Sequence, residues 1–376
     1  MQINRIIYQD IQQQFFKGRI ILLTGPRRVG KSTLIHRLCQ EYGDYLFLDG
    51  DDPSVRQLLD TPNFEQIRLL VGSHKLIFID EAQRIKNTGL TLKMMNDRIK
   101  DLQVIVTGSS SLDLGDKLQE SLTGRKWEYH LYPISWEEWY QHKDYLTVSQ
   151  QLESRILYGM YPEVINNPGA EEKILKELTK SYLYKDILAL SGIKKPDILE
   201  KLVTALAYQI GNEVSYNELS QLLGVDKNTV SVYIELLEKA FVVHRLTPYN
   251  ENQRNEIKTH RKIYFYDTGI RNAVINNFNP LALRKDKGAL WENFVLNERL
   301  KHIEYHQQNI QSFFWRSRQA GEIDLLEKKN GQLQAYEIKW SPRAKFKVPI
   351  AFSNLYEASF MGIHPENFLR FVSHVE

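Results

Sequence analysis

Near its N-terminus the chain reads Gly25-Pro26-Arg27-Arg28-Val29-Gly30-Lys31-Ser32, followed by Thr33. This run fits the pattern G-x-x-x-x-G-K-[ST], in which glycines let backbone N–H groups wrap phosphates at the start of a helix. An apolar strand is expected before it at Arg19–Leu23, and an amphipathic helix after it at Ser32–Tyr42. Strand, loop and helix together predict a nucleotide-phosphate site over residues 25–33.

Two positions of this loop have defined chemistry. The ammonium of Lys31 is expected to reach the β and γ phosphates of ATP, and the Ser32 hydroxyl to ligate Mg²⁺. The Thr33 hydroxyl is expected to assist at the α phosphate. The alternative is a chance loop without function, which the matching strand and helix argue against. ATP and Mg²⁺ are therefore the expected cofactors.

A later apolar strand, Leu76–Asp80, ends in two acidic residues. In a phosphate-binding fold Asp80 lies near the magnesium ion, and Glu81 lies beside the attacking water as general base. The alternative is that the acids only cap a helix, which is the weaker interpretation after a phosphate loop. Asp80 and Glu81 complete the expected site for ATP hydrolysis.

Two further features are open to two interpretations each. Thr107 and Ser109 end a third apolar strand and would sense the γ phosphate; alternatively the run Ser109–Ser111 caps the following helix. Arg125 would act as an arginine finger on its own γ phosphate or on a neighbour's, the latter implying a homo-oligomer. An exposed arginine without a role fits this position as well.

Short apolar runs alternate with helical stretches from Arg19 to Leu131, which is typical of an α/β fold with a parallel sheet and crossover helices. The expected strands are Arg19–Leu23, Tyr45–Asp49, Leu76–Asp80, Gln103–Thr107 and Trp127–Leu131. They are mostly apolar, as strands covered on both faces must be. We expect a P-loop, AAA-like ATPase domain over residues 1–134 and a helical linking region over residues 135–195.

The next segment, residues 196–280, has the outline of a winged helix. Ser215 and Glu218 form a capping box, Gly224 a turn, and Asp226 begins a second helix that runs to about Ala240. Two apolar runs separated by a polar, basic loop follow, as in the hairpin of a winged helix. The candidates for DNA contact are Lys227, Asn228, Thr229, Ser231, Tyr233, Arg254, Lys258, His260, Arg261 and Lys262. Protein–protein contact is an equal alternative, because acidic residues share the second helix.

The C-terminal segment permits a geometric argument. Two β-like runs surround Asn330-Gly331, the strongest signal for a two-residue hairpin turn. With those residues in the turn, Lys329 pairs with Gln332, and counting outward pairs Asp324 with Glu337. The Cβ atoms of directly opposed residues lie about 5 Å apart, a spacing at which two carboxylates can share one divalent cation.

These carboxylates are the parts of a metal-dependent nuclease. Lys339 lies two residues beyond Glu337, hence on the same face, where it would orient a water that magnesium activates. Glu292, on a helix that precedes the hairpin, is expected to supply another carboxylate to the metal. The alternative is a cross-strand cluster of Asp324, Glu337 and Lys339 on a solvated sheet face, although opposed acids are destabilising without a cation.

Composition restricts the class of protein. Cys39 is the only cysteine, which excludes an internal disulfide and a multi-cysteine metal site; the ten histidines show no ligand spacing, so a structural zinc is not expected. The net charge of +3 and the pI near 8.6 permit DNA contact without requiring it. No apolar run is long enough to span a bilayer, and no signal-peptide pattern opens the chain. We expect a cytoplasmic protein without membrane contact.

The order of the motifs resembles that of a prokaryotic family of AAA-like ATPases. The resemblance rests on Gly25–Ser32, Leu76–Glu81, Thr107–Ser110, Leu122–Arg125, Tyr158–Val164, Tyr264–Asp267, Glu292, Asp324, Glu337 and Lys339. In that family a P-loop domain is followed by a winged helix and an α/β domain of the PD-(D/E)XK, restriction-endonuclease-like type, here expected over residues 281–376. The resemblance implies a magnesium–ATP site at Gly30, Lys31, Ser32, Asp80 and Glu81, and a nuclease-like site at Asp324, Glu337 and Lys339. Tyr158–Val164 is expected to have a structural role.

Two functions from different classes follow. The first is ATP-dependent processing of DNA, in which the nucleotide state controls metal-dependent cleavage. The second is a nucleotide-operated switch or DNA-binding regulator, whose C-terminal domain only binds DNA or a protein partner. The intact set of Asp324, Glu337 and Lys339 favours the first. A DNA motor such as a helicase is disfavoured, because the chain has one P-loop core and no recognisable second motor domain.

Overall fold

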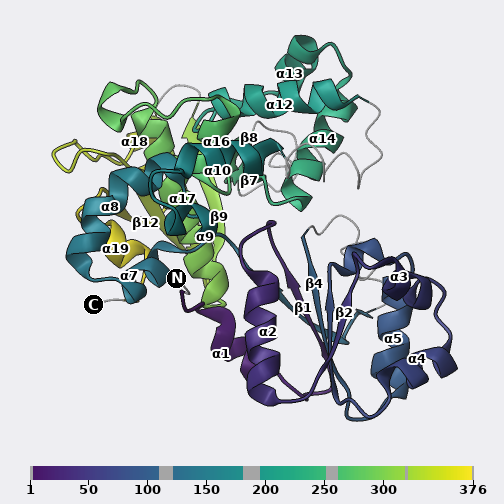
Figure 1. The fold of residues 1–376 in the computed structure, drawn as a ribbon. Coiled ribbons are helices and arrows are strands. Elements are labelled where there is room, and N and C mark those ends of the chain that lie inside the picture. The colour runs from purple at the N-terminus through teal and green to yellow at the C-terminus, as the bar shows by residue number, and fades with distance from the viewer. Residues whose placement is uncertain (1–2, 110–121, 181–194, 251–260, 318–320, 375–376) are drawn as a thin grey trace. The chain divides into compact units, whose positions relative to one another are not determined.

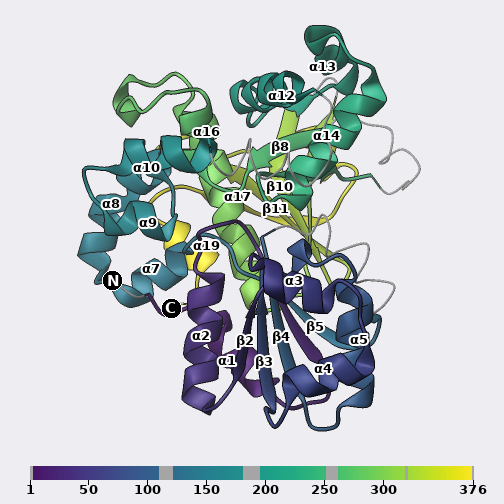
Figure 2. The same ribbon diagram turned by 45° about the vertical axis from the view of Figure 1, so that its right-hand side comes forward.

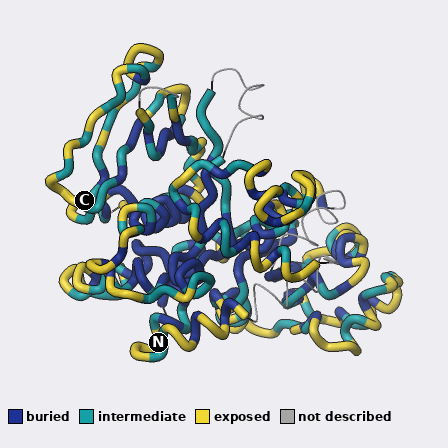
Figure 3. The backbone as a smooth tube through the Cα atoms, turned by 90° about the horizontal axis from the view of Figure 1, so that it is seen from above, coloured by how far each residue is buried: buried dark blue, intermediate teal, exposed yellow. Residues whose placement is uncertain are grey.

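A computed structural model describes residues 3–109, 122–180, 195–250, 261–317 and 321–374 (Figure 1). The chain forms two compact units. Unit 1 comprises Met1–Pro133 with Lys239–Phe241, and unit 2 comprises Ile134–Glu238 with Val242–Glu376. Buried residues concentrate in the central strands and helices, and exposed residues at the turns (Figure 3). Each unit is described by itself.

Unit 1 contains the predicted parallel sheet. Its strands are β1 Ile20–Thr24, β2 Leu46–Asp49, β3 Leu76–Asp80, β4 Gln103–Gly108 and β5 Lys126–His130. They lie in the order β2-β3-β4-β1-β5, and every neighbouring pair is parallel. The prediction of a parallel α/β sheet is therefore confirmed, with each strand bound within one residue of its expected position.

Helices cover both faces of this sheet (Figure 2). They are α1 Ile7–Gln13, α2 Lys31–Tyr42, α3 Pro53–Leu59, α4 Phe64–Val71, α5 Thr88–Arg98 and the short 3₁₀ helix η1 Ala82–Arg84. Alternate strand residues such as Ile77, Ile79 and Val104 pack against Ile67 and Met95 of the helices in one buried apolar cluster. Strands covered on both faces must be apolar throughout, which explains why their sequences show no alternation.

Unit 2 combines a helical part with one long sheet. Its helices are α7 Trp136–His142, α8 Tyr145–Tyr158, α9 Pro162–Asn166, α10 Glu171–Leu178, α12 Pro196–Tyr208, α13 Tyr216–Leu223, α14 Lys227–Lys239, α16 Thr268–Val274, η3 Leu281–Leu283, α17 Lys287–Tyr305, α18 Ile350–Ser353 and α19 Phe368–Val372. Its strands are β6 Glu213–Val214, β7 Val243–Pro248, β8 Arg261–Phe265, β9 Gln311–Ser317, β10 Gly321–Lys329, β11 Gln332–Ile338 and β12 Ala358–Ile363.

The seven strands form a single sheet in the order β12-β11-β10-β9-β7-β8-β6. Strands β7 and β9 pair in parallel, with Thr247 opposite Phe313 and Pro248 opposite Phe314. The boundary expected between residues 280 and 281 therefore does not separate two sheets. Pairing β7 with β9 removes two exposed strand edges, which an independent domain on either side would have to protect.

The part from α12 to β8 has the element order helix, strand, helix, helix, strand, strand. Gly224 ends α13 in the left-handed conformation at φ 64°, and the Asp226 carboxylate accepts a hydrogen bond from Thr229 N at 2.9 Å. Strand β8 pairs antiparallel with both β7 and β6. The expected loop residues Arg254, Lys258 and His260 lie outside the described residues.

Two segments that carry the resemblance meet inside unit 2. Gly159 has φ 72°, and a Cβ atom there would lie 2.0 Å from Oδ1 of Asp267. The Asp267 carboxylate accepts hydrogen bonds from Met160 N at 2.7 Å and Ile270 N at 3.1 Å, so it cannot move aside without losing both. This contact supports the structural role expected for Tyr158–Val164.

Replacing Gly159 with alanine should therefore destabilise unit 2. We expect Gly159→Ala to lower the free energy of unfolding by about 3 kcal/mol, because it adds a steric conflict with Asp267 to the strain of a positive φ. Gly169→Ala is the matched control, since Gly169 also has a positive φ but nothing lies within 4 Å of an added Cβ. It should cost only about 1 kcal/mol. Equal losses in urea unfolding would contradict the steric argument.

Candidate functional site

The phosphate loop connects β1 to α2 in unit 1. Gly30 precedes the helix with φ 96°, Arg28 has φ 59°, and a Cβ atom at Gly25 would lie 2.1 Å from the Leu131 carbonyl oxygen. Both glycines are therefore required by the backbone. Ser32 and Thr33 lie in the first turn of α2, whose N-terminus has no side-chain cap. The N–H groups of that turn are suited to bind an anion.

Arg5 holds the loop from outside the motif. Its guanidinium donates to the Val29 carbonyl at 2.9 Å and to the Tyr132 carbonyl at 2.6 Å. The sequence analysis missed this residue, because nothing at position 5 signals a contact with a loop that begins twenty residues later. Arg5 fixes the loop against the end of the sheet and so helps to preserve its shape.

Lys31 is almost fully buried, at 4% exposure. Its ammonium donates to the carbonyl oxygens of Gly25 at 2.9 Å and Pro26 at 2.7 Å. Burial lowers the pKa of Lys31 to about 8, although the charges of Glu81 and Asp80 act in the opposite direction. The ammonium is held by neutral carbonyls, which phosphate oxygens can replace with a stronger, charged partner.

The two acids at the end of β3 lie beside the end of β4. Asp80 Oδ1 accepts hydrogen bonds from the Thr107 hydroxyl and from Glu81 N at 3.1 Å. Glu81 has φ 47°, so the chain turns sharply directly after the strand. Thr107, expected as a γ-phosphate sensor, is thus bonded to the expected magnesium ligand. Asp80, Glu81 and Ser32 offer carboxylate and hydroxyl oxygens, the kind of ligand that Mg²⁺ prefers.

Gln83 links the general base to the next strand. Its amide donates to the Glu81 carboxylate and to the Ser109 hydroxyl at 2.9 Å. The sequence did not single out Gln83, because its burial and its bond to Ser109 arise only from tertiary packing. Ser109 therefore connects to Glu81 through one side chain. The alternative, in which Ser109–Ser111 cap the following helix, concerns residues 110–121, which lie outside the described residues.

Arg125 does not serve its own phosphate loop. It lies just before β5, and Ile20 N donates to its carbonyl oxygen at 2.9 Å, which places it where β1 begins. The loop follows the other end of β1, about 17 Å away at ~3.3 Å per residue. The Arg125 guanidinium pairs with Asp97 at 2.8 Å. The expectation that Arg125 contacts the γ phosphate of its own chain was wrong, because Arg125 lies at one end of β1 and the phosphate loop lies at the other. Contact with the γ phosphate of a neighbouring chain stays a prediction.

The C-terminal hairpin has the predicted register. Lys329 lies opposite Gln332 across Asn330 and Gly331, which have φ 51° and 83°. The ladder between β10 and β11 ends at Leu325 and Tyr336, one pair before the expected partners Asp324 and Glu337. The pairing of β10 with β9 shifts between Ile323 and Leu326. Asp324 therefore lies in an irregular part of the strand.

Each of the two hairpin acids has its own partners. Asp324 Oδ2 accepts a hydrogen bond from Ile338 N at 2.7 Å. Burial, reinforced by the charge of Glu292, raises the pKa of Asp324 to about 7. Glu337 pairs with Lys339 Nζ at 2.5 Å and accepts from Lys347 N at 3.0 Å. Lys339 thus lies beside Glu337, as the spacing predicted.

Lys262 provides an unexpected partner for these carboxylates. Its side chain is only 1% exposed, and its ammonium pairs with Glu292 at 3.1 Å and with Glu322. The Tyr264 hydroxyl donates to the same Glu292 oxygen at 2.5 Å. Burial alone would lower the pKa of Lys262, but the charges of Glu292, Glu322 and Asp324 raise it strongly. The expectation that Lys262 contacts DNA was wrong, because its side chain on β8 is buried in the interior of unit 2.

The expected DNA-reading helix presents only part of its candidate set. Lys227 and Asn228 are exposed and Ser231 is half-buried. Tyr233 is buried, and the Thr229 hydroxyl donates to the Asp226 cap at 2.6 Å. Tyr233 was therefore a wrong candidate for DNA contact, since it packs on the inner face of the helix. The other positions stay predictions.

Within the described residues, no helix combines the length and apolarity needed to cross a bilayer.

Burial raises the pKa of the Cys39 thiol to about 12, so the thiol is unreactive at neutral pH.

Three family models match successive parts of the chain. Residues 17–140 match a model described as AAA domain, and this stretch contains the phosphate loop, Asp80 and Glu81. Residues 149–281 match Domain of unknown function (DUF8612), and residues 287–368 match Domain of unknown function (DUF4143). The third stretch contains Glu292 and the hairpin carboxylates.

Known proteins resemble most of the chain. An uncharacterized protein of Mycobacterium tuberculosis is 28% identical over 336 residues, which cover 88% of this chain and 72% of the relative. An uncharacterized protein of Methanocaldococcus jannaschii is 24% identical over 344 residues, covering 86% and 75%. The solved structure of a Walker-type ATPase from Pyrococcus abyssi has a TM-score of 0.52 at 15% identity, covering 73% of this chain and 96% of that one. The AAA match and this likeness support a P-loop ATPase fold.

The buried state of Lys31 should make nucleotide affinity depend on pH. Unbound, Lys31 loses its proton above pH 8, whereas bound phosphates hold the proton on the ammonium. Binding then takes up one proton, so ATP affinity should fall by up to about tenfold per pH unit above pH 8. The free energy of unfolding should instead rise with pH there, since the unfolded chain binds the extra proton.

Calorimetric titration with ATP from pH 7 to 9.5 measures this effect in wild type and in Lys31→Arg. The arginine keeps its charge at every pH tested, so its affinity, though weaker, should vary less. A wild-type affinity that is constant over the range would contradict the lowered pKa.

Proposed function

We propose that this chain is an ATP-hydrolysing switch that acts on DNA, with ATP and Mg²⁺ bound at residues 25–33, Asp80 and Glu81. One observation carries the ATPase part: Lys31, Asp80 and Glu81 converge at the start of α2, beside a helix N-terminus without a side-chain cap. The residues fit a magnesium–nucleotide complex, because the Lys31 ammonium can exchange its carbonyl partners for phosphate oxygens and the Asp80 carboxylate can ligate magnesium. Ser32 and Asp80 would hold the magnesium ion, which would offset the negative charge that develops during hydrolysis.

Each residue of the site has a role in the proposed hydrolysis. Lys31 binds phosphate oxygens, and Glu81 accepts the proton of the attacking water. Gln83 positions the Glu81 carboxylate and connects it to Ser109, so that a change at the end of β4 reaches the base. These hydrogen bonds connect the nucleotide site to the end of β4.

The DNA part rests on the second unit. The order α12-β6-α13-α14-β7-β8 with an antiparallel hairpin supports a winged helix, and Lys227 and Asn228 are exposed where such a helix meets DNA. The segment from α17 to β12 supports a PD-(D/E)XK nuclease-like fold, since Glu292, Asp324, Glu337 and Lys339 lie on its helix and hairpin. A protein partner on α14 is the alternative to DNA.

The C-terminal carboxylates do not fit a magnesium ion as they are arranged. The Lys262 ammonium already pairs with Glu292 and Glu322, and its charge also acts on Asp324. A buried lysine at this position supplies the positive charge that a metal would otherwise supply. This observation favours a switch that binds DNA without cutting it.

A second candidate function is ATP-controlled cleavage of DNA. It is favoured by the presence of Asp324, Glu337 and Lys339 at the end of one hairpin, where Lys339 lies beside Glu337. In this case Lys262 has to leave the carboxylates before a cation can bind. The two candidates thus differ in one measurable property, cleavage by the wild-type protein.

Substitution of the general base tests ATP hydrolysis. We expect Glu81→Gln to bind ATP but to lower kcat by about 100-fold or more, since the base is lost and the shape is kept. Lys31→Ala should lose binding. Glu65→Gln, on the exposed face of α4, is the control and should hydrolyse ATP normally. An undiminished rate in Glu81→Gln, measured by phosphate release, would refute the assignment of the base.

Removal of the Lys262 ammonium tests the C-terminal centre. The assay is cleavage of linear, circular and single-stranded DNA with Mg²⁺ or Mn²⁺, with and without ATP. We expect no cleavage by wild type, and metal-dependent cleavage or metal-dependent thermal stabilisation in Lys262→Met, because its carboxylates lose their cation. Lys329→Met, at the exposed end of β10, is the matched control.

Cleavage by wild type that disappears in Lys339→Ala would overturn the switch and establish the nuclease. If Lys262→Met neither cleaves DNA nor gains stability from metal, the carboxylates are a structural cluster alone. Lys262→Arg keeps the charge and should behave as wild type, which separates loss of the ammonium from loss of the fold.

A further inference from the structure

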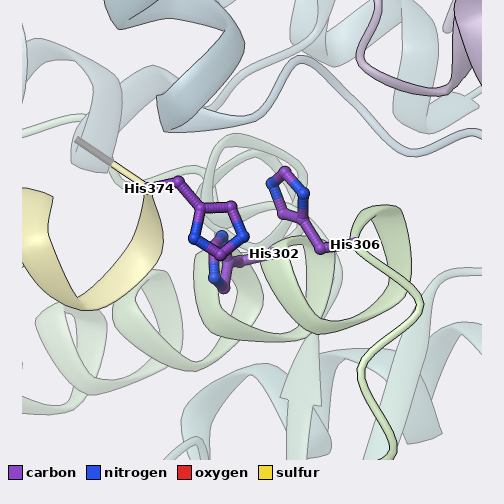
Figure 4. A group of neighbouring side chains, drawn as sticks. All are labelled: His302, His306 and His374. Atoms are coloured by element: carbon purple, nitrogen blue, oxygen red, sulfur yellow. The ribbon is translucent and has the colours of Figure 1, made fainter.

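Three histidines of unit 2 lie together (Figure 4). His302 and His306 come from α17, and His374 follows α19. One ring nitrogen of each lies within 4.8 Å of the other two, and the ring centroids are 4.2 to 4.7 Å apart. We call these three residues the histidine cluster.

The expectation that the histidines lack ligand spacing was wrong. Positions four apart on a helix lie on the same face, and His302 and His306 have this spacing. The sequence therefore already placed His302 and His306 side by side. The third member, His374, comes from a distant segment that only the packing of α19 against α17 brings near.

A buried carboxylate joins the three residues. Glu137 of α7 is 3% exposed, and its Oε2 lies 3.2 Å from His302 Nδ1 and 2.9 Å from His306 Nε2. His374 N donates to its other oxygen at 3.3 Å. Glu137 therefore contacts all three members of the cluster.

The three imidazoles offer nitrogen ligands at close range. A neutral imidazole has one nitrogen lone pair, which is the form in which histidine binds metals.

We propose that His302, His306 and His374 bind one divalent transition-metal ion of the zinc class, with Glu137 as the accompanying carboxylate. Imidazole nitrogens select Zn²⁺, Co²⁺ or Ni²⁺ over Mg²⁺ and Ca²⁺, which prefer oxygen. Tetrahedral ligation at ~2.05 Å needs nitrogens about 3.3 Å apart, so the rings must approach by about 1.5 Å. The exposed His374 is free to make most of this movement.

The bound ion would connect three elements that are distant in sequence. Glu137 lies on α7, two ligands lie on α17, and the third follows α19. Glu137 holds the rings by their N–H groups, an arrangement common around histidine-bound zinc. The site is therefore a structural clamp within unit 2, independent of the nucleotide site and of the hairpin carboxylates.

Titration of the nucleotide-free full chain with ZnCl₂ tests this proposal, with excess Mg²⁺ present to saturate oxygen-rich sites. We expect one Zn²⁺ per chain with a Kd on the order of 1 µM or tighter, and a rise in thermal stability. Co²⁺ should give the strong visible absorption of a four-coordinate ion.

Substitutions identify the ligands. His374→Ala, at an exposed position that does not endanger folding, should weaken binding at least tenfold, and His306→Ala likewise. His74→Ala, in unit 1, is the matched control and should bind as wild type. The proposal is overturned if wild type binds no Zn²⁺ under these conditions, or if binding is unchanged in both His374→Ala and His306→Ala.

Discussion

The ion pairs of Lys262 with Glu292 and Glu322 connect two strands of the long sheet of unit 2 with helix α17. Lys262 comes from β8, Glu292 from α17 and Glu322 from β10, so one ammonium holds the hairpin of the helical part against the C-terminal part. A buried ion pair is costly to break, because the remaining partner keeps its charge without compensation. This constraint decides the chemistry of the carboxylates: while Lys262 is present among them, they need no metal.

Lys31 and Lys262, both buried, illustrate how environment sets function. Lys31 is bonded to neutral carbonyls, and its pKa is lowered to about 8. Lys262 is bonded to carboxylates, and its pKa is raised. The first ammonium gains from an incoming phosphate, whereas the second is already compensated. A site for an anionic ligand and a self-neutralised cluster thus arise from the same residue type.

Sequence patterns predicted the features that depend on neighbours along the chain. The phosphate loop, the strand bounds and the hairpin turn at Asn330 all follow from local geometry and apolar pattern. The roles of Lys262, Gln83 and His374 did not follow from the sequence, because Lys262 contacts Glu292 and Glu322, Gln83 contacts Ser109, and His374 contacts His302 and His306 only through tertiary packing. Arg125 was misplaced although the expected parallel sheet already puts the start of every strand at one edge, opposite to the loop that follows β1.

The central claim is that nucleotide controls how the chain engages DNA. Fluorescence anisotropy of labelled duplex DNA with the hydrolysis-deficient Glu81→Gln chain tests it most directly, by comparing Mg²⁺–ATP, Mg²⁺–ADP and no nucleotide at one salt concentration. The account predicts at least a fivefold difference in DNA affinity between ATP and ADP, the size of a modest coupling free energy. Equal affinity in all three states, or no binding to DNA in any of them, would contradict it.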